Sequence, residues 1–262
     1  MSADTIMDLL TLTAEQNEQW SIRVDHRLCL GPPGGKHISG GACTAILIDA
    51  LEQVTGKPLI QTNAQFFATP KANENATVTV DRRKPGRSVE MISAVLTHAA
   101  ELQVVLSGSF GTRRDIGDYH WTHPPDFPSP DKGMKMPFVR ADPGDLHTIL
   151  DMRLATDPED GRMVFWVRTP SRLNMRPARF LALIADYIPE AIHMSIGRPA
   201  GAISLDNSIR VTGHQPTDWT LCVTELEEIK HGIFHGRMTI FSEGGELLAT
   251  ASQSGVVKLL DA

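Results

Sequence analysis

Cysteine is scarce in this chain: Cys29, Cys43 and Cys222 are the only three in 262 residues, and they lie far apart among apolar neighbours. This odd number and wide spacing fit neither a disulfide framework nor a zinc site, so we expect reduced core cysteines and no bound metal. An excess of positive charge is also lacking, since the net charge is -6 and the pI is about 5.9. This balance argues against a general binder of nucleic acid or of anionic membranes.

Long apolar runs are lacking as well, and we do not expect a targeting segment. The most apolar stretch, residues 37–56, contains Asp49 and Glu52 and is too short and too polar to span a bilayer. Residues 1–16 carry acids but no basic start, so a secretory signal is not indicated. We therefore expect a cytoplasmic protein with no membrane partner. Its composition, 41% hydrophobic and 21% charged, is that of an ordinary globular protein of one large domain or two smaller ones.

Residues 37–56 are predicted to contain a central helix. Ser39 precedes the apolar run as a candidate N-cap, and Gly56 is a candidate C-terminal stop. The apolar residues between them cover more than one helical face, which predicts a helix buried nearly all round. Gly40 and Gly41 at its start would expose N–H groups at the positive end of the helix dipole, where a carbonyl or an anion could approach closely.

Strand-like segments surround this helix in the sequence. One strand is expected before it, and four follow it, separated by turns short enough for antiparallel hairpins; the five ranges are 20–30, 59–68, 76–83, 88–98 and 102–110. The same order returns in the second half, in the ranges 150–167 (strand material), 176–188 (helix), 203–212, 219–228, 233–242 and 247–258. Asp49 in the first helix is echoed by Asp186 in the second. An offset of about 140 residues indicates two tandem copies of one fold.

Between the two copies the composition changes. Prolines crowd the polar stretch 113–145, which has little hydrophobic periodicity and is predicted to be a linker running over the surface. We therefore divide the chain into an N-terminal domain (1–112), this linker, and a C-terminal domain (146–262).

The tandem order of strand, long helix and four antiparallel strands resembles the double hot-dog fold of the acyl-CoA thioesterase II family. The motifs that carry the resemblance are the runs 37–41, 65–70, 83–89, 107–111, 204–208 and 248–257. The resemblance implies an α+β tandem (double) hot-dog fold, with two antiparallel sheets each wrapped around a long central helix and joined edge to edge. It also implies hydrolysis of fatty acyl-CoA to free acid and CoA, with CoA present only as part of the substrate, no other cofactor, and a homo-oligomer (dimer or higher).

The resemblance further implies which residues act. The family holds and activates a water with an aspartate on the first strand after the second helix, a glutamine on the last strand, and a threonine between them. Asp206 and Gln253 match the first two positions. A carboxylate can take a proton from water, and an amide can both donate to that water and accept from it. An N–H near Gly41 would then polarise the thioester carbonyl.

The family's threonine has no clear counterpart here. Glu227 stands near its position, while Thr224 or Ser252 would be a substitute. A carboxylate at Glu227 beside Asp206 would instead raise the pKa of Asp206. The missing threonine also favours a different function, that of a non-catalytic acyl-CoA-binding or scaffold protein. A third possibility is an enoyl-CoA hydratase-type enzyme, which would need an Asp/His pair that the sequence does not offer.

The choice of carboxylate stays open at this point. Strict alternation places Asp206 on the same strand face as Ser204, which predicts a solvated position, and Gln253 can equally serve in strand pairing. Asp49 is the rival, because single hot-dog thioesterases of another branch carry an acid on the central helix. Its echo at Asp186 favours a structural role repeated in both halves.

Coenzyme A carries phosphates, so an acidic protein that binds it needs a local basic patch. Arg83, Lys84 and Arg87 form the densest one, on a predicted hairpin turn. The alternative is a solvated turn without a ligand.

Overall fold

The computed structural model describes residues 4–16, 18–31, 35–82, 85–112, 116–139, 141–169, 177–213 and 217–260. The first half of the chain supplies the elements α1 (Asp4–Leu9), β1 (Thr13–Ala14), β2 (Gln19–Arg23), η1 (His26–Leu28), β3 (Cys29–Leu30), β4 (His37–Ile38), α2 (Gly40–Thr55), β5 (Leu59–Phe66), β6 (Asn75–Asp81), β7 (Val89–His98) and β8 (Glu101–Gly111). The second half supplies η2 (Pro130–Lys132), β9 (Met134–Lys135), α3 (Leu146–Ile149), β10 (Met152–Leu154), β11 (Arg162–Arg168), α4 (Pro177–Ala185), α5 (Glu190–Ile196), β12 (Ala200–Val211), β13 (Trp219–Lys230), β14 (Ile233–Ser242) and β15 (Leu247–Leu259).

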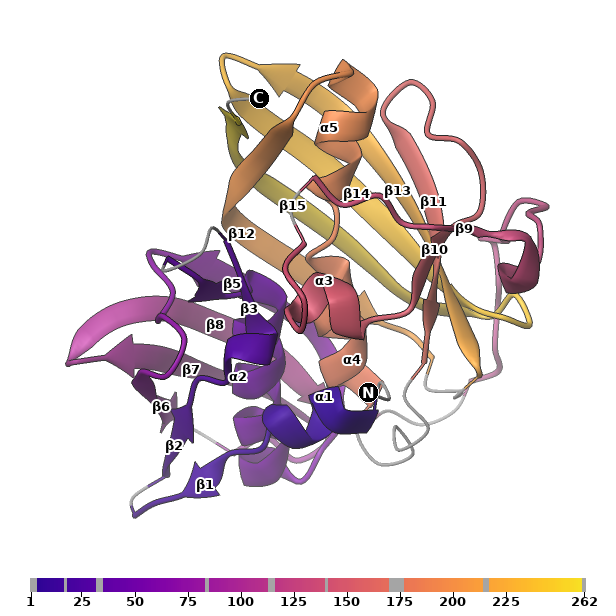
Figure 1. Cartoon of the computed structure of the whole chain (residues 1–262). Coiled ribbons are helices and arrows are strands. Elements are labelled where there is room, and N and C mark those ends of the chain that lie inside the picture. Colours follow the sequence, from indigo (N-terminus) through magenta and orange to yellow (C-terminus); the bar gives the residue numbers. More distant parts are fainter. Residues whose placement is uncertain are drawn as a thin grey trace.

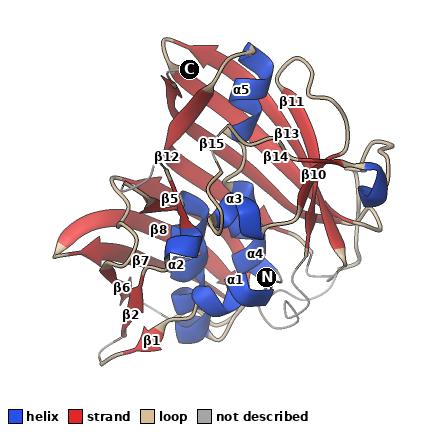
Figure 2. Ribbon diagram, in the orientation of Figure 1, coloured by secondary structure: helices blue, strands red, loops and turns tan. Residues whose placement is uncertain are grey.

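The strands form one large antiparallel sheet, beside a small sheet of β3 and β4. The large sheet has 13 strands within the described residues, in the order β1-β2-β6-β7-β8-β5-β12-β15-β14-β13-β11-β10-β9. Its two ends come from the two halves of the chain, and helices α2, α4 and α5 lie against one face, with α1 on the same side (Figures 1 and 2). We call the face that the helices cover the inner face and the opposite one the outer face.

The two sheets were expected to join edge to edge, and the pairing of β5 with β12 makes that join, so the chain has one continuous large sheet where we expected two. Asn63 and Ser208 lie opposite each other across this junction, and Asn63 Nδ2 donates to Ser208 Oγ at 2.7 Å. Each half would otherwise leave one strand edge with unpaired backbone groups, so edge-to-edge pairing turns two sheets into one.

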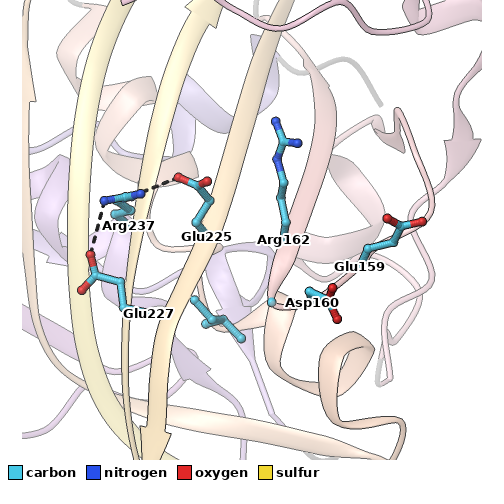
Figure 3. A pocket seen from close by; sticks show the side chains of 8 residues that line it. Glu159, Asp160, Arg162, Glu225, Glu227 and Arg237 are labelled. Atoms are coloured by element: carbon cyan, nitrogen blue, oxygen red, sulfur yellow. Dashed lines mark hydrogen bonds and ion pairs between the residues drawn. The ribbon is translucent and has the colours of Figure 1, made fainter.

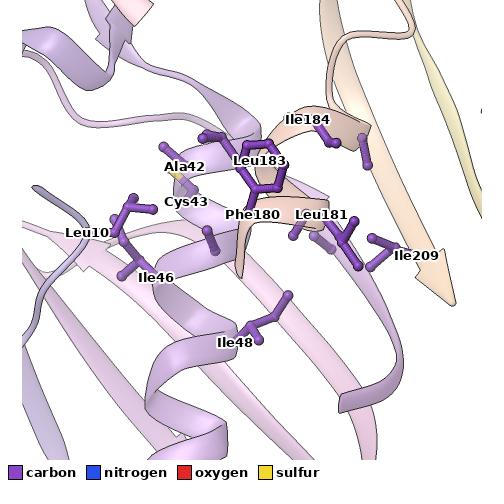
Figure 4. Close-up of a cluster of buried hydrophobic side chains, with 14 of the residues drawn as sticks. Leu10, Ala42, Cys43, Ile46, Ile48, Phe180, Leu181, Leu183, Ile184 and Ile209 are labelled. Atoms are coloured by element: carbon purple, nitrogen blue, oxygen red, sulfur yellow. The ribbon is translucent and has the colours of Figure 1, made fainter. Parts of the chain in front are cut away.

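Helix α2 follows its predicted boundaries. The Ser39 hydroxyl accepts a hydrogen bond from the Ala42 N–H at 3.1 Å, and Gly56 ends the helix with a φ of 63°. Every residue from Gly41 to Leu51 is buried, and α2 packs against α4 as well as against the sheet (Figure 4). The three cysteines are buried and free of disulfides, as predicted.

The second half does not contain the long central helix that we expected. Helix α4 ends at Ala185, a turn follows over 186–189, and α5 begins after Pro189. Proline has no N–H to give to a preceding turn of helix, so it favours a break at this position. The break leaves Asp186 just beyond the C-terminal end of α4.

The proline-rich segment is only partly a surface linker. Strand β9 pairs with β10, and Met136 just after it is buried at 3% exposure. Its last part therefore belongs to the packed second half. The domain boundaries at 112 and 145 stay a prediction.

Candidate active site

Asp186 lies at the centre of a group of polar side chains on the inner face. Its Oδ2 accepts the Gly41 N–H at 2.7 Å, and its Oδ1 accepts a hydrogen bond from Gln253 Nε2, also at 2.7 Å. The Gln253 amide nitrogen donates to Ser204 Oγ at 2.7 Å as well, and Ser204 also hydrogen-bonds to Asp186. We call Gly41, Asp186, Ser204 and Gln253 the Asp186 cluster. It joins the first half of the chain, through α2, to α4, β12 and β15 of the second.

A glycine is needed where α2 meets α4. A Cβ at Gly41 would lie 2.5 Å from the Leu183 carbonyl oxygen and 2.8 Å from Asp186 Cβ. Real side chains do not tolerate such distances, so only glycine lets the N-terminal end of α2 come this close to the C-terminal end of α4. The close approach brings the Asp186 carboxylate onto the positive end of the α2 dipole.

The surroundings of Asp186 set its pKa near the range of physiological pH. Burial raises the pKa to about 6, and the hydrogen bonds from Gly41, Gln253 and Ser204 oppose that rise. A carboxylate with such a pKa is ionised at neutral pH and still basic enough to take a proton from water.

Gln253 presents an unused acceptor in this cluster. Its side chain is 2% exposed, and its Oε1 has no hydrogen-bond partner among the described residues. Asn207 lies opposite Gln253 on β12 and donates to the Ala185 carbonyl at 3.3 Å, which fixes the end of α4 against the sheet. Buried acceptors are normally satisfied, so Gln253 Oε1 is suited to hold a water molecule.

An unused donor lies beside it. Gly40 is the first residue of α2, and the N–H groups of a first helical turn have no acceptor within the helix. Within the described part of the chain the Gly40 N–H makes no hydrogen bond, whereas the Gly41 N–H is taken by Asp186. An ideal Cβ built on Gly40 would lie 3.2 Å from Asp186 Oδ2, so Gly40 adjoins the carboxylate.

The structure places Asp206 on the outer face, away from this cluster. A β-bulge between Ser204 and Asp206 gives β12 one extra residue, and the Asp206 carboxylate accepts the Ser254 N–H at 2.8 Å. The bulge also breaks the strict alternation, so Ser204 and Asn207 both face inward while Asp206 faces outward. Gln253 is therefore brought together with Asp186 and not with Asp206, although both Gln253 and Asp206 were predicted site residues.

Glu227 also lies on the outer face. Arg237 pairs with Glu225 at 3.0 Å and with Glu227 at 3.7 Å, and these residues line an open cleft of about 370 Å³ (Figure 3). Arg162 lines the same cleft from β11. Because Arg237 is opposite Ser252, the neighbour of inward-facing Gln253, the cleft and the Asp186 cluster are on opposite sides of the sheet.

Thr224 faces inward but belongs to another part of the core. Its side chain is fully buried, and its Oγ1 has no partner among the described residues. It lies in register with Met238 and Ala251, two strands away from β15. That separation is roughly 10 Å at normal strand spacing, too far for contact with Gln253.

Asp49, the rival carboxylate, is paired inside the core. Its side chain is 2% exposed, and Arg179 Nη1 of α4 lies 3.3 Å from Asp49 Oδ1. Gln53 Nε2 donates to Asp49 Oδ2 at 2.8 Å. This environment fits the structural role that the sequence suggested for Asp49. Asp186, its counterpart in the second half of the chain, does not have that environment.

The predicted basic turn is partly outside the described residues, because Arg83 and Lys84 fall in a gap. Arg87 is exposed. Before the gap, Arg82 Nε donates to buried Glu90 at 2.7 Å, and Lys57 pairs with the same carboxylate at 3.1 Å. Arg82 also bonds to a carbonyl in the last turn of α2, which is about 20 Å from Gly41 at the helical rise per residue. A ligand that bridges the turn and the Asp186 cluster would have to be long and extended.

Sequence reasoning missed Asp186 and Ser204. Asp186 was visible as the echo of Asp49, but nothing in the pattern shows that α4 ends there and turns its carboxylate towards the other helix. Ser204 was assigned to the outer face because the bulge that reverses its direction leaves no mark in the hydrophobic pattern.

Two classes of site are not found in the part of the chain described here. No group of three or more His, Cys, Asp or Glu side chains is placed to hold a metal ion within those residues. Their helices are also too short or too polar for a membrane span.

Comparison with known proteins gives one consistent family. The model of the acyl-CoA thioesterase N-terminal domain matches residues 31–111, and that of the acyl-CoA thioesterase C-terminal domain matches residues 112–257. No curated protein shows a significant match.

Solved structures resemble the chain over nearly its whole length. A Novosphingobium aromaticivorans DSM 12444 protein, provisionally named a thioesterase, is 28% identical with a TM-score of 0.87, covering 94% of this chain and 98% of its own. The acyl-CoA thioesterase II TesB2 of Mycobacterium marinum is 19% identical with a TM-score of 0.77, over 98% of this chain and 99% of its own. A tesB protein of Mycobacterium avium subs paratuberculosis is 16% identical with a TM-score of 0.81, over 98% and 100%. These likenesses support a hot-dog α+β fold, and with both family models matched the chain belongs to the double hot-dog acyl-CoA thioesterase family and is an enzyme that hydrolyses acyl-CoA thioesters.

Proposed function

We propose that Asp186 is the general base of the hydrolysis and that Gln253 and Ser204 hold the attacking water with it. The observation that carries this proposal is the hydrogen-bonded cluster of a partly buried carboxylate, an amide with an unused acceptor, and a hydroxyl. The resemblance implied Asp206 for this role; against it, the Asp206 carboxylate accepts the Ser254 N–H on the outer face, away from Gln253.

In the first step the water lies between the Asp186 carboxylate and Gln253 Oε1. Asp186 takes one proton from the water while the water oxygen attacks the thioester carbonyl carbon. The carbonyl oxygen becomes an oxyanion as the C–O bond forms. The Gly40 N–H, at the positive end of α2, is the free donor suited to stabilise it, since the Gly41 N–H already serves Asp186.

In the second step the tetrahedral intermediate collapses and its C–S bond breaks. The electron pair of that bond leaves on sulfur, and protonated Asp186 returns its proton to the thiolate. The products are a carboxylic acid and free CoA, so Asp186 is regenerated without a cofactor. A group with a pKa of about 6 is suited to both directions of this proton transfer at neutral pH.

The Ser204 hydroxyl weakens the case for a non-catalytic scaffold protein. That alternative rested on the apparent lack of a threonine, and Ser204 supplies a hydroxyl within hydrogen-bond distance of Gln253. The Asp186 cluster contains no histidine, so it does not provide the Asp/His pair that a hydratase-type enzyme would need. A cytoplasmic homo-oligomer with a coenzyme A contact at Arg83, Lys84 and Arg87 stays a prediction.

The test compares Asp186→Asn with Asp206→Asn, two substitutions of the same size and the same change in charge. Thiol release from a panel of short, medium, long and aromatic acyl-CoAs should give kcat/KM for each variant. We expect Asp186→Asn to lose about 10²–10⁴-fold in kcat, the range for a general base, and Asp206→Asn to stay within threefold of wild type. The reverse result would show that Asp206 is the base, and unchanged activity in both would exclude either carboxylate.

A further inference from the structure

Phe66 is a half-buried aromatic side chain at the border of the Asp186 cluster. It ends β5, at the junction of the two halves, and packs against the core from the inner face. An ideal Cβ on Gly40 would lie 3.1 Å from Phe66 Cζ and 3.2 Å from Asp186 Oδ2. The ring and the carboxylate therefore both adjoin the start of α2, where the free Gly40 N–H lies.

A second ring closes the other side of the same region. Ser204 is opposite Gly255, and Gly255 is opposite Phe234, in register across three strands. Phe234 is fully buried, and its ring is so close that a Cβ on Gly255 would lie 2.5 Å from it. Phe234 is thus enclosed in the core, whereas Phe66 is partly exposed.

We propose that Phe66 is a specificity-determining residue that limits the bulk of the acyl group at the carbon next to the thioester carbonyl. This inference rests on the proposed function, because it assumes that the carbonyl oxygen meets the Gly40 N–H. With the oxygen placed there, the acyl α-carbon must pass beside the Phe66 ring. A straight chain presents only hydrogens to the ring at that carbon, whereas a branched chain presents a methyl group.

The ring has a second consequence for the carboxylate. An apolar ring beside Asp186 excludes water from one side of it, and exclusion of water disfavours the charged form of a carboxylate. Removal of the ring should therefore let water reach Asp186 and should move the acid limb of the pH profile. A residue that only packs in the core would not shift that limb.

Phe67 provides a matched control. It is the next residue along the chain, it is also phenylalanine, and its side chain is 63% exposed. Truncation of Phe67 removes the same atoms from a site that does not adjoin Gly40.

The experiment measures kcat/KM for the shortest straight-chain acyl-CoA that the wild type hydrolyses and for its 2-methyl analogue. We expect Phe66→Ala to raise the branched-to-straight ratio at least tenfold, the usual discrimination for one methyl group in a pocket. The acid limb of kcat/KM should also move below its wild-type position near pH 6. Phe67→Ala should leave both quantities unchanged.

Phe66→Leu guards against a folding defect, because leucine keeps an apolar side chain at the junction. It should raise the ratio by a smaller factor, with a melting temperature close to wild type. A ratio within twofold of wild type in Phe66→Leu and in folded Phe66→Ala, with no shift of the acid limb, would overturn this inference. That outcome would leave the proposed function intact. The proposed function itself fails only if Asp186→Asn retains activity.

Discussion

Replacement of Asp186 by asparagine should remove activity and, at neutral pH, make the protein more stable. The pKa of Asp186 is raised from 3.8 to about 6 by burial, so the folded state binds its proton more tightly than the unfolded state does. The free energy of unfolding therefore decreases as the pH rises from about 4 to 6, because Asp186 loses its proton in a buried site. The full decrease is present above pH 6. Asparagine, which does not ionise, avoids that cost.

The size of the gain follows from the same shift. A shift of about two pKa units corresponds to about 3 kcal/mol, which is an upper limit because Asp186 is partly reached by solvent. We expect a gain of about 1–2 kcal/mol at pH 7, or about 2–8 °C in melting temperature for a chain of this size. The hydrogen bonds can be kept, since Gln253 can turn its unused Oε1 towards the new amide and the Ser204 hydroxyl can donate or accept.

The assay is thermal unfolding of wild type and Asp186→Asn at half-unit steps from pH 4 to 8. The difference in melting temperature should be near zero at pH 4, rise between pH 4 and 6, and then stay constant. Asp206→Asn is the control, and it should lose stability because the Asp206 carboxylate accepts the Ser254 N–H of the bulge. A lower melting temperature for Asp186→Asn at pH 7, or a difference that does not depend on pH, would refute the reasoning.

Three further outcomes are expected. In the wild type, kcat/KM should fall tenfold per pH unit below about pH 6, because the base must be ionised, and a flat profile down to pH 4.5 would exclude Asp186 as the base. Gly41→Ala should lose about 2–3 kcal/mol in urea unfolding together with its activity, since its methyl group would collide with a backbone carbonyl of α4. Glu90→Gln should cost about 3 kcal/mol by the same measurement, because Arg82 and Lys57 lose their shared carboxylate, while folded Glu90→Gln keeps wild-type kcat.

Much of the fold could be predicted from hydrophobic pattern and turn residues. The strands predicted at 88–98 and 233–242 match β7 and β14 to within a residue, and Ser39 and Gly56 bound α2 as expected. These features depend on local chemistry, namely side-chain alternation, capping hydroxyls and the conformational freedom of glycine. The short strands β1 and β9 were missed because two residues of pairing leave no periodicity to detect.

The candidate site was predictable only in part. Gln253 and Gly41 lie in the cluster that the structure assembles, whereas Asp206, Glu227 and Thr224 lie outside it. The hydrophobic pattern shows which face of the sheet a side chain lies on only where inward-facing and outward-facing residues alternate along the strand without a break.

By itself, the sequence determined that this chain has two copies of one helix-and-strand unit, and that the first copy begins its helix with a glycine pair fit for close approach. It also carried the resemblance that the family match later confirmed. Only the tertiary structure decided which carboxylate meets Gln253. That choice depends on the end of α4, the bulge in β12 and the packing of α2 on α4, which are contacts between segments far apart in the chain.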